Sequence, residues 1–212
     1  MKIIVGLGMK SAASVDPQVQ AFISWGQGNK NYDLVDMLMI GNEVLQAKHD
    51  TAANLIAKIK SVRSQVVAAG YTGPIGTADT VQSYLQNPGL CASGVLDVVG
   101  LNAHPYFDAN PSKSAADDGA IVQSYVNRVS AACANKNIFV TETGFPNHGN
   151  TNGGMVPSYA NQKIAIESVL SVMGPNVCLF TTFEDLWKQP GQYNVEQSWG
   201  MFDLTTPSND VW

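Results

Sequence analysis

Two glutamates follow apolar runs of the kind that form buried strands. Glu43 comes directly after the run 36–42, and Glu142 follows the run 137–141. A parallel strand buried on both faces is continuously apolar, so each glutamate is expected at the carboxyl end of such a strand. Two carboxylates that face one cleft can act as a general acid and a nucleophile. Cleavage of a glycosidic bond with retention needs the pair roughly 5–5.5 Å apart.

A structural explanation competes with the catalytic one. Each glutamate could merely cap the helix that follows its strand, or pair with a lysine. An ionised carboxylate beside an apolar interior is costly unless it has partners. The matching positions of Glu43 and Glu142, each beside other polar groups, therefore favour the catalytic interpretation.

Polar and aromatic residues also follow other expected strands. Asn42 precedes Glu43, and its amide could bind a sugar hydroxyl near the reacting carbon. Two further segments, 102–107 and 180–188, supply the other candidate binding residues: His104, Tyr106, Phe107, Glu184, Asp185, Trp187 and Lys188. Aromatic rings can stack on the apolar C–H faces of sugars. An ordinary core role for the aromatic residues and a solvated salt bridge for the charged ones stay open.

Strand-like and helix-like segments alternate along the whole chain. Strands are expected over 2–6, 34–40, 74–77, 96–101, 138–141 and 177–183. Helices are expected to begin at Asp16, Asp50 and Ser158, with others over 80–86 and 121–129. The alternation predicts an α/β fold with a parallel sheet, either doubly wound or a (β/α) barrel. Active sites of barrels lie at the carboxyl ends of the strands, which favours the barrel.

Helical spacing also predicts which side chains are buried. In the helix after Asp50 the expected buried stripe is Leu55, Ile59, Val62 and Val66, and in the helix after Ser158 it is Ile164, Val169 and Met173.

Composition limits the possible classes of protein. The 212 residues are 45% hydrophobic and only 14% charged, which suits one ordinary domain and argues against disorder. The net charge of −5 shows no basic character, so no nucleic acid partner is expected. No apolar run approaches the roughly 20 residues that span a bilayer, so no membrane span is expected. The apolar stretch at the amino terminus is too short for an export signal, so we expect any such signal to be outside this chain or absent.

Other catalytic motifs are missing from the sequence. The third glycine of a dinucleotide loop is replaced by Ser11, and there is no P-loop, no HExxH pair and no GxSxG elbow. We therefore expect no metal and no organic cofactor, and we expect His49 and His148 on the surface. The cysteines, at 91, 133 and 178, are too widely spaced for a CxxC motif. Either one disulfide with a leftover thiol or three free thiols is possible.

Four motifs occur in a fixed order along the chain. They are Ile-Gly-Asn-Glu at 40–43, Asn-Ala-His-Pro-Tyr-Phe at 102–107, Thr-Glu-Thr-Gly-Phe-Pro at 141–146 and Phe-Glu-Asp-Leu-Trp-Lys at 183–188. Together they resemble glycoside hydrolase family 17, in particular its fungal cell-wall branch of β-1,3-glucan glucosidases and glucanosyltransferases. The resemblance runs nearly end to end.

The resemblance implies a (β/α)8 TIM-type barrel, a retaining mechanism and β-1,3-glucan as substrate. It assigns the acid/base role to Glu43 and the nucleophile to Glu142. Tyr106 matches a family tyrosine near the nucleophile, and we expect it to hold Glu142 by a hydrogen bond. Family members often have Glu at the position of Asp185, so this position departs from the pattern.

Family members begin with two further βα units, so the expected strand 2–6 corresponds to their third strand. Six of the eight barrel strands would then be present. We therefore expect residues 1–212 to form a single catalytic domain that is truncated at its amino terminus. The family also implies a secreted, monomeric protein of the cell wall, whose export signal is not present in this chain.

The sequence therefore predicts a retaining β-1,3-glucan glycosidase or glucanosyltransferase that acts on the polysaccharide or its oligosaccharides. Three alternatives stay open: a catalytically impaired fragment that only binds β-glucan, a fragment that does not fold, and a barrel hydrolase of β-1,4-glucan or mannan. The choice between hydrolysis and transfer also stays open.

Overall fold

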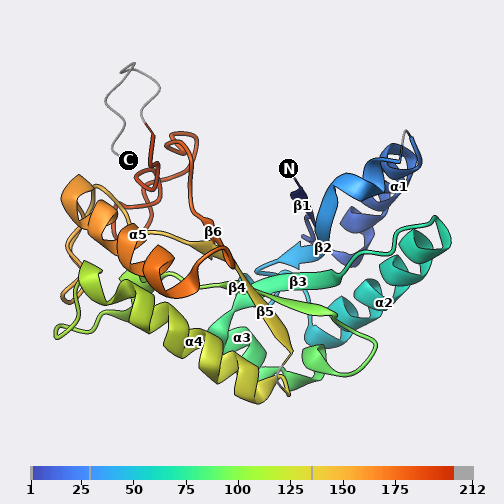
Figure 1. The fold of residues 1–212 in the computed structure, drawn as a ribbon, viewed down its shortest axis with the longest axis horizontal. Helices are drawn as coiled ribbons and strands as arrows, with labels where there is room; N and C mark the ends of the chain where they lie inside the picture. Colours follow the sequence, from blue (N-terminus) through green and yellow to red (C-terminus); the bar gives the residue numbers. More distant parts are fainter. Residues whose placement is uncertain (1, 29, 135, 203–212) are drawn as a thin grey trace. The chain divides into compact units, whose positions relative to one another are not determined.

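The computed structural model describes residues 2–28, 30–134 and 136–202. In this part of the chain six strands form one sheet, whose spatial order follows the sequence from β1 to β6 (Figure 1). The strands are β1 (Ile3–Leu7), β2 (Val35–Asn42), β3 (Ile75–Thr80), β4 (Val98–Asn102), β5 (Asn137–Thr143) and β6 (Val177–Leu179). The pairs β1–β2, β2–β3, β3–β4 and β5–β6 are parallel. The predicted α/β fold with a parallel sheet is confirmed.

Helices lie between the strands, as the alternation predicts. They are α1 (Asp16–Gln27), α2 (Ala52–Ala68), α3 (Val81–Gln86), α4 (Asp118–Ala132) and α5 (Tyr159–Met173). Among the residues that the structure describes, five short 3-10 helices accompany them: η1 (Ala12–Val15), η2 (Asn31–Leu34), η3 (Pro88–Cys91), η4 (Pro105–Asp108) and η5 (Ala115–Asp117). Within the described ranges, none of the helices combines the length and the apolar character that crossing a membrane requires.

The chain divides into two compact units. The first unit contains residues 1–102 and 128–139, and the second contains residues 103–127 and 140–212. Helix α4 and strand β5 contribute residues to both.

Aliphatic side chains form the core of the first unit. Leu38 and Ile40 of β2 are fully buried, and so is the whole predicted stripe of α2, which consists of Leu55, Ile59, Val62 and Val66. Helices α1 and α2 lie beside each other (Figure 1), and Lys58 Nζ lies 2.7 Å from Asp16 Oδ1 across them. Burial of these side chains stabilises the helices against the strands more than helix propensity does.

The start of α2 differs by one residue from the prediction. Thr51 is the N-cap, because its hydroxyl accepts a hydrogen bond from the Asn54 N–H at 3.3 Å. The Asp50 carboxylate instead accepts from the Thr51 N–H at 2.8 Å. At the other end Gly70 has a φ of 99°, the left-handed conformation that commonly follows a helix and that glycine adopts easily.

One disulfide joins Cys91 to Cys133 in the first unit. Of the two arrangements that the sequence left open, the structure has the disulfide with a leftover thiol, which is Cys178 in the second unit. The cross-link connects the end of η3 to the residue after α4, across 42 positions of sequence.

Aromatic side chains form much of the core of the second unit. Tyr106, Phe145 and Trp199 are buried in one cluster with Ala115, Ile121, Met155, Ala165 and Val195. On α5, Val169 and Met173 are buried as predicted, but Ile164 is 43% exposed and Ala165 and Ile166 are buried instead. The prediction for Ile164 was wrong because the helix buries the face that carries positions 162, 165, 166, 169 and 173.

Strand β6 is shorter than the predicted strand 177–183. The Phe180 N–H still donates to the Thr143 carbonyl of β5 at 2.7 Å, but the Thr181 N–H donates to the Trp199 carbonyl at 3.0 Å. The Met201 N–H in turn donates to the Thr181 carbonyl at 3.0 Å. Apolar composition alone does not reveal that this segment pairs with an irregular one.

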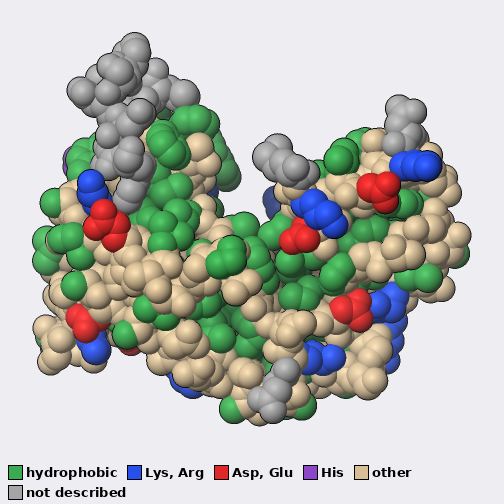
Figure 2. All heavy atoms as spheres, viewed as in Figure 1, with side chains coloured by type: hydrophobic (Ala, Val, Ile, Leu, Met, Phe, Trp, Pro, Cys, Tyr) green, Lys and Arg blue, Asp and Glu red, His purple; other side chains and the backbone are tan. Residues whose placement is uncertain are grey.

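Charged side chains are sparse on the face shown in Figure 2, where acidic and basic groups lie near one another. This mixed pattern agrees with the low charged fraction of 14%.

Candidate active site

The backbone turns sharply where β2 ends, and this turn presents Glu43. Gly41 has a φ of 82° and Glu43 a φ of 49°, both in the left-handed region. A Cβ on Gly41 would lie 2.7 Å from Cγ2 of Val44, so only glycine fits there. The Glu43 N–H donates to the Ala78 carbonyl at 2.8 Å, which fixes the turn to β3.

An asparagine from β4 holds the Glu43 carboxylate. The Asn102 side-chain amide donates to Glu43 Oε1 at 3.1 Å and to Asn42 Oδ1 at 3.1 Å. Asn102 is 3% exposed. The structure thus brings together Asn42 and Glu43, which the sequence predicted as site residues. It adds Asn102, which occurs in one of the four motifs but was not chosen as a site residue.

A buried aspartate fixes the loop that follows Glu43. Asp79 lies near the end of β3, is 0% exposed, and accepts from the Leu45 N–H at 2.9 Å and from the Thr80 N–H at 2.8 Å. Sequence reasoning did not identify Asp79. An acidic residue at the end of an otherwise apolar run was the available signal.

In the second unit, Glu142 lies next to His104. Glu142 belongs to β5, and its main-chain carbonyl accepts from the Ala103 N–H at 2.7 Å. His104 Nε2 lies 3.6 Å from Glu142 Oε2, and the two side chains are 15% and 26% exposed. This distance is longer than a hydrogen bond.

Aromatic rings surround the His104 imidazole. Its ring centroid lies 5.0 Å from that of Trp199 and 5.6 Å from that of Phe180, both in edge-on contact. Nδ1 of His104 is buried and has no hydrogen-bond partner among the described residues. A neutral ring with its proton on Nε2 leaves no buried N–H unpaired and directs its donor at Glu142.

Cys178 also lies near Glu142. Burial of the thiol, with a smaller contribution from the charge of Glu142, raises the pKa of Cys178. The side chain is therefore a neutral thiol at physiological pH rather than a reactive thiolate.

The expected hydrogen bond from Tyr106 to Glu142 is not the one in the structure. The Tyr106 hydroxyl donates to the main-chain carbonyl of Asn150 at 2.6 Å, and the side chain is 0% exposed. Pro105 starts a 3-10 helix, which turns the backbone so that His104, and not Tyr106, reaches the glutamate. Burial, followed by an effect of Tyr193, raises the pKa of Tyr106 to about 12.

Phe107 and Trp187, two of the aromatic candidate binding residues, are both accessible. Phe107 is 45% exposed, and its ring centroid lies 5.9 Å from that of Trp199. Trp187 is 79% exposed. Both can therefore offer an aromatic face to a ligand.

The charged residues after β6 form separate contacts. Glu184 accepts from the Asn147 side-chain amide at 2.7 Å. Asp185 pairs with Lys188 at 2.8 Å and accepts from the Trp187 indole N–H at 3.3 Å. The Lys188 ammonium lies 4.7 Å from the centroid of the Phe180 ring. The salt bridge that the sequence analysis left as an alternative is therefore present between Asp185 and Lys188.

Sequence reasoning missed two buried residues of the second unit. Asn147 is 2% exposed and directly follows the motif 141–146, so its position was the available signal. Trp199 is also 2% exposed and lies in an irregular segment with no strand-like or helical pattern. In the part of the chain that the structure describes, no three His, Cys, Asp or Glu side chains are grouped as a metal ion would require.

Comparison with known proteins finds relatives that agree with one another. A family model described as the BtgE/BtgC glycoside hydrolase domain matches residues 1–200. The chain is 37% identical over 205 residues to a probable beta-glucosidase btgE of Aspergillus fumigatus, which covers 96% of this chain and 35% of that protein. It is 37% identical over 196 residues to the probable family 17 glucosidase SCW10 of Saccharomyces cerevisiae, covering 92% of this chain and 49% of that protein.

A third relative is the cell surface mannoprotein MP65 of Candida albicans, which is 37% identical over 196 residues, covering 92% of this chain and 51% of that protein. This chain spans 35–51% of the length of these three relatives.

Solved structures share the fold. The glycoside hydrolase family 17 beta-1,3-glucanosyltransferase of Rhizomucor miehei superposes with a TM-score of 0.77 at 22% identity, covering 95% of this chain and 72% of that chain. A structure from a study of two plant beta-glucan endohydrolases superposes with a TM-score of 0.68 at 20% identity, covering 95% of this chain and 80% of that chain. The six-stranded parallel fold thus resembles family 17 barrel structures.

Proposed function

Because this chain belongs to the BtgE/BtgC glycoside hydrolase domain family, and with it to glycoside hydrolase family 17, we propose that it cleaves or transfers β-1,3-glucan with retention. The observation that carries the proposal is the setting of two glutamates. Glu43 and Glu142 each lie at or just beyond the end of a parallel strand, and each has a polar side chain beside its carboxylate. A solved Rhizomucor miehei relative holds laminaritriose, a β-1,3-linked glucose trimer.

The first step forms a bond between Glu142 and the sugar. A carboxylate oxygen of Glu142 attacks the anomeric carbon, and the glycosidic C–O bond breaks. Glu43 gives its proton to the departing oxygen, so the leaving sugar departs as a neutral alcohol. This step requires the two carboxylates to approach within roughly 5–5.5 Å.

The second step releases the sugar from Glu142. Water or a sugar hydroxyl attacks the same carbon and passes its proton to Glu43, while the bond to Glu142 breaks. Water gives hydrolysis, and a sugar hydroxyl gives transfer. Asn102 supports this cycle because an amide N–H can stay with Glu43 Oε1 in both protonation states. His104 supports it by offering a donor to the charged form of Glu142.

Names of the relatives bear on where the protein acts. One of them is a cell surface mannoprotein, and we propose that this chain acts in the same setting, on glucan of the cell wall.

The decisive experiment is incubation of the protein with laminaripentaose, followed by mass spectrometry of the products. Longer oligosaccharides mean transfer and shorter ones mean hydrolysis, and either supports the proposal. Unchanged substrate that nevertheless binds would instead support a binding protein.

Two variants test the assigned roles. Glu142→Gln keeps the size of the side chain but removes the nucleophile, so turnover should fall by about 1,000-fold or more. Glu43→Ala should stop cleavage of natural oligosaccharides, while added azide should restore turnover of an aryl glycoside, whose leaving group needs no acid. Normal activity of Glu142→Gln would reject the mechanism.

A further inference from the structure

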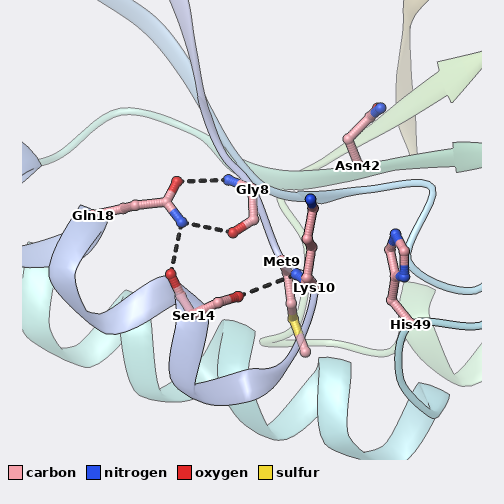
Figure 3. A pocket seen from close by; sticks show the side chains of 7 residues that line it. All are labelled: Gly8, Met9, Lys10, Ser14, Gln18, Asn42 and His49. Carbon is pink, nitrogen blue, oxygen red and sulfur yellow. Dashed lines mark hydrogen bonds between the residues drawn. The ribbon is translucent and has the colours of Figure 1, made fainter. Parts of the chain in front are cut away.

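A pocket of the first unit lies at the carboxyl ends of β1 and β2 (Figure 3). Asn42, the residue before Glu43, lines it, and so does His49, which is exposed as the sequence predicted. The Gln18 amide holds one wall, because it donates to the Gly8 carbonyl at 2.7 Å and accepts from the Gly8 N–H at 2.8 Å. This pocket therefore belongs to the candidate active site.

A separate pocket of the same unit lies at the opposite ends of the strands, and its volume is about 480 Å³. Its lining comes from Arg63 and Val67 near the end of α2, from the loop 71–74 that leads into β3, and from Asp97, the residue before β4. Strands β2, β3 and β4 are parallel, so their amino ends share one edge of the sheet and their carboxyl ends share the other. Glu43 follows a carboxyl end, so a ligand in this second pocket would not compete with one at Glu43.

An ion pair forms the polar side of this second pocket. Arg63 Nη1 donates to Asp97 Oδ2 at 2.8 Å, and Arg63 Nη2 donates to the Val95 carbonyl at 2.9 Å. Asp97 Oδ2 also accepts from the Ile75 N–H at 3.0 Å, which fixes the carboxylate against β3. The Arg63 and Asp97 side chains are 24% and 45% exposed, so a ligand can reach both. Because their opposite charges offset each other, the pocket favours a neutral ligand over an ion.

This polar side has hydrogen-bonding capacity left for a ligand. Both Nη atoms of Arg63 carry a second N–H. Among the residues that the structure describes, Asp97 Oδ1 and the hydroxyl of Thr72 have no hydrogen-bond partner, and both residues are exposed or partly exposed. Donors and acceptors therefore lie side by side. Adjacent hydroxyl groups of a sugar need both, since each hydroxyl donates one hydrogen bond and accepts others.

The rest of the lining is apolar and held in place. Val67 and Pro74 are both exposed and offer C–H surface. The Tyr71 hydroxyl donates to the Pro74 carbonyl at 3.0 Å. A Cβ on Gly73 would lie 2.5 Å from the Tyr71 hydroxyl oxygen, so the loop can approach this ring only with glycine there. A sugar ring has C–H groups on its faces and hydroxyl groups around its edge, so it matches both kinds of surface in this pocket.

We propose that the pocket of Arg63, Val67 and Asp97 is a second, non-catalytic binding site for β-1,3-glucan. The proposal rests on the proposed function, because the chemistry of the pocket selects a neutral ligand rich in hydroxyl groups and the proposed substrate is such a ligand. The site holds one part of a polysaccharide while another part reacts at the glutamates. Binding at two places raises the effective concentration of a long glucan at the active site, whereas a short oligosaccharide gains nothing from it.

The test observes this pocket by NMR of protein labelled with ¹³C at the threonine methyl groups, in the Glu142→Gln variant so that the sugar is not consumed. Thr72→Val identifies the Thr72 signal, which titration with laminarihexaose should shift in a saturable way. Val67→Glu removes apolar surface and places a second carboxylate beside Asp97, so the Kd read from this shift should rise about tenfold. Ala68→Glu makes the same charge change at the next position, which is exposed and outside the lining, and should leave the Kd unchanged.

The outcomes separate this proposal from the proposed function, which is tested by conversion of laminaripentaose with Glu142 intact. Val67→Glu should convert this short substrate at the wild-type rate, and a slower rate would contradict the independence of the two sites. If laminaripentaose is converted but the Thr72 signal does not move, the pocket proposal is wrong and the function stands. If the Thr72 signal moves and depends on Val67 while no conversion occurs, the pocket binds glucan and the catalytic function is wrong. Equal Kd values for Val67→Glu and Ala68→Glu would also reject the pocket.

Discussion

The two units hold their glutamates in different ways. In the first unit Glu43 is held by Asn102, which stands on the regular strand β4 beside an aliphatic core. In the second unit Glu142 faces His104, whose ring is packed among aromatic side chains. One glutamate therefore has an amide that can accompany both its acid and its base form. The other has an imidazole nitrogen 3.6 Å from its carboxylate, which suits the nucleophile that we propose.

The segments that hold Asn102 and His104 in place also differ between the two units. Residues around His104 come from irregular segments, which are tied together by buried amides. The Gln162 side chain donates to the Phe145 carbonyl at 2.9 Å and to the Gly200 carbonyl at 3.2 Å, and the Asn147 side chain donates to the Gly200 carbonyl at 3.0 Å. The first unit has a disulfide and a regular strand behind Asn102, whereas the segments around His104 in the second unit are joined by the side chains of Gln162 and Asn147.

Among the changes that test the difference between the two units, loss of the disulfide should have the largest effect on stability. Reduction of Cys91–Cys133, or the double change of both cysteines to Ala, should lower the free energy of unfolding by about 4 kcal/mol, because a loop spanning 42 positions is released in the unfolded chain. Urea denaturation with and without reductant measures the change. Cys178→Ala is the control and should lack this loss, and a drop below about 1 kcal/mol for the double variant would contradict the assigned role.

A buried carboxyl group in the second unit makes its stability depend on pH. Asp118 is 1% exposed, and burial, followed by the charge of Asp117, raises its pKa from 3.8 to about 8. Between these values the folded state holds a proton that the unfolded state has lost, so stability falls as pH rises through this window.

Asp118→Asn should remove this dependence of stability on pH. It should also raise the free energy of unfolding at pH 7 by about 3 kcal/mol. This gain is smaller than the pKa difference alone would give, because the first turn of α4 can open locally. Asp117 provides an opposite control. Its pKa is lowered by the Ser114 N–H and by Lys113, so it contributes stability above its ordinary pKa of 3.8 that is lost as pH falls. Denaturation of the wild type, Asp117→Asn and Asp118→Asn at pH 3, 5, 7 and 8 measures both effects, and identical slopes between pH 5 and 8 for wild type and Asp118→Asn would refute the prediction.

Gln162 tests the dependence of the second unit on single amides. Gln162→Leu keeps a similar volume but leaves the carbonyls of Phe145 and Gly200 without this donor, so we expect a loss of about 2 kcal/mol. Gln65→Leu on the first unit, where the side chain is only half-buried and bonds at 3.2–3.4 Å, should be nearly neutral. Thermal unfolding measures the loss of stability in both variants. Equal losses would show that the second unit depends on single amides no more than the first unit does.

The smallest expected effect concerns the partners of the glutamates. His104→Phe keeps an aromatic ring but removes the donor to Glu142, and Asn102→Ala removes the donor to Glu43. Each should lower kcat/KM about tenfold, the loss expected for one hydrogen bond to a charged group. Steady-state kinetics with laminaripentaose measures the loss in each variant. Unchanged kcat/KM in both variants would show that these residues do not assist the glutamates.

The regular elements could be predicted from sequence because their signals are local. Continuous apolar runs located the six described strands, and the period of α2 identified its buried stripe of four residues. The positions of Glu43 and Glu142 at strand ends follow from the same runs. Their catalytic roles stay predictions.

Contacts made by irregular segments could not be predicted in this way. The partner of Tyr106 is a main-chain carbonyl 44 residues away, and no periodic pattern encodes it. Trp199 reaches His104 through a segment without regular structure. Ile164 was misplaced because an apolar residue on a helix of mixed pattern can lie on either face.

The left-handed backbone at Glu43 has a consequence for laboratory evolution. A side chain in that conformation costs about 1–2 kcal/mol relative to glycine, so Glu43→Gly should make the protein more heat-resistant while it loses the proton donor that we propose. A library screened for heat tolerance alone would therefore enrich inactive clones at this position, and a screen for this protein has to select for both properties at once.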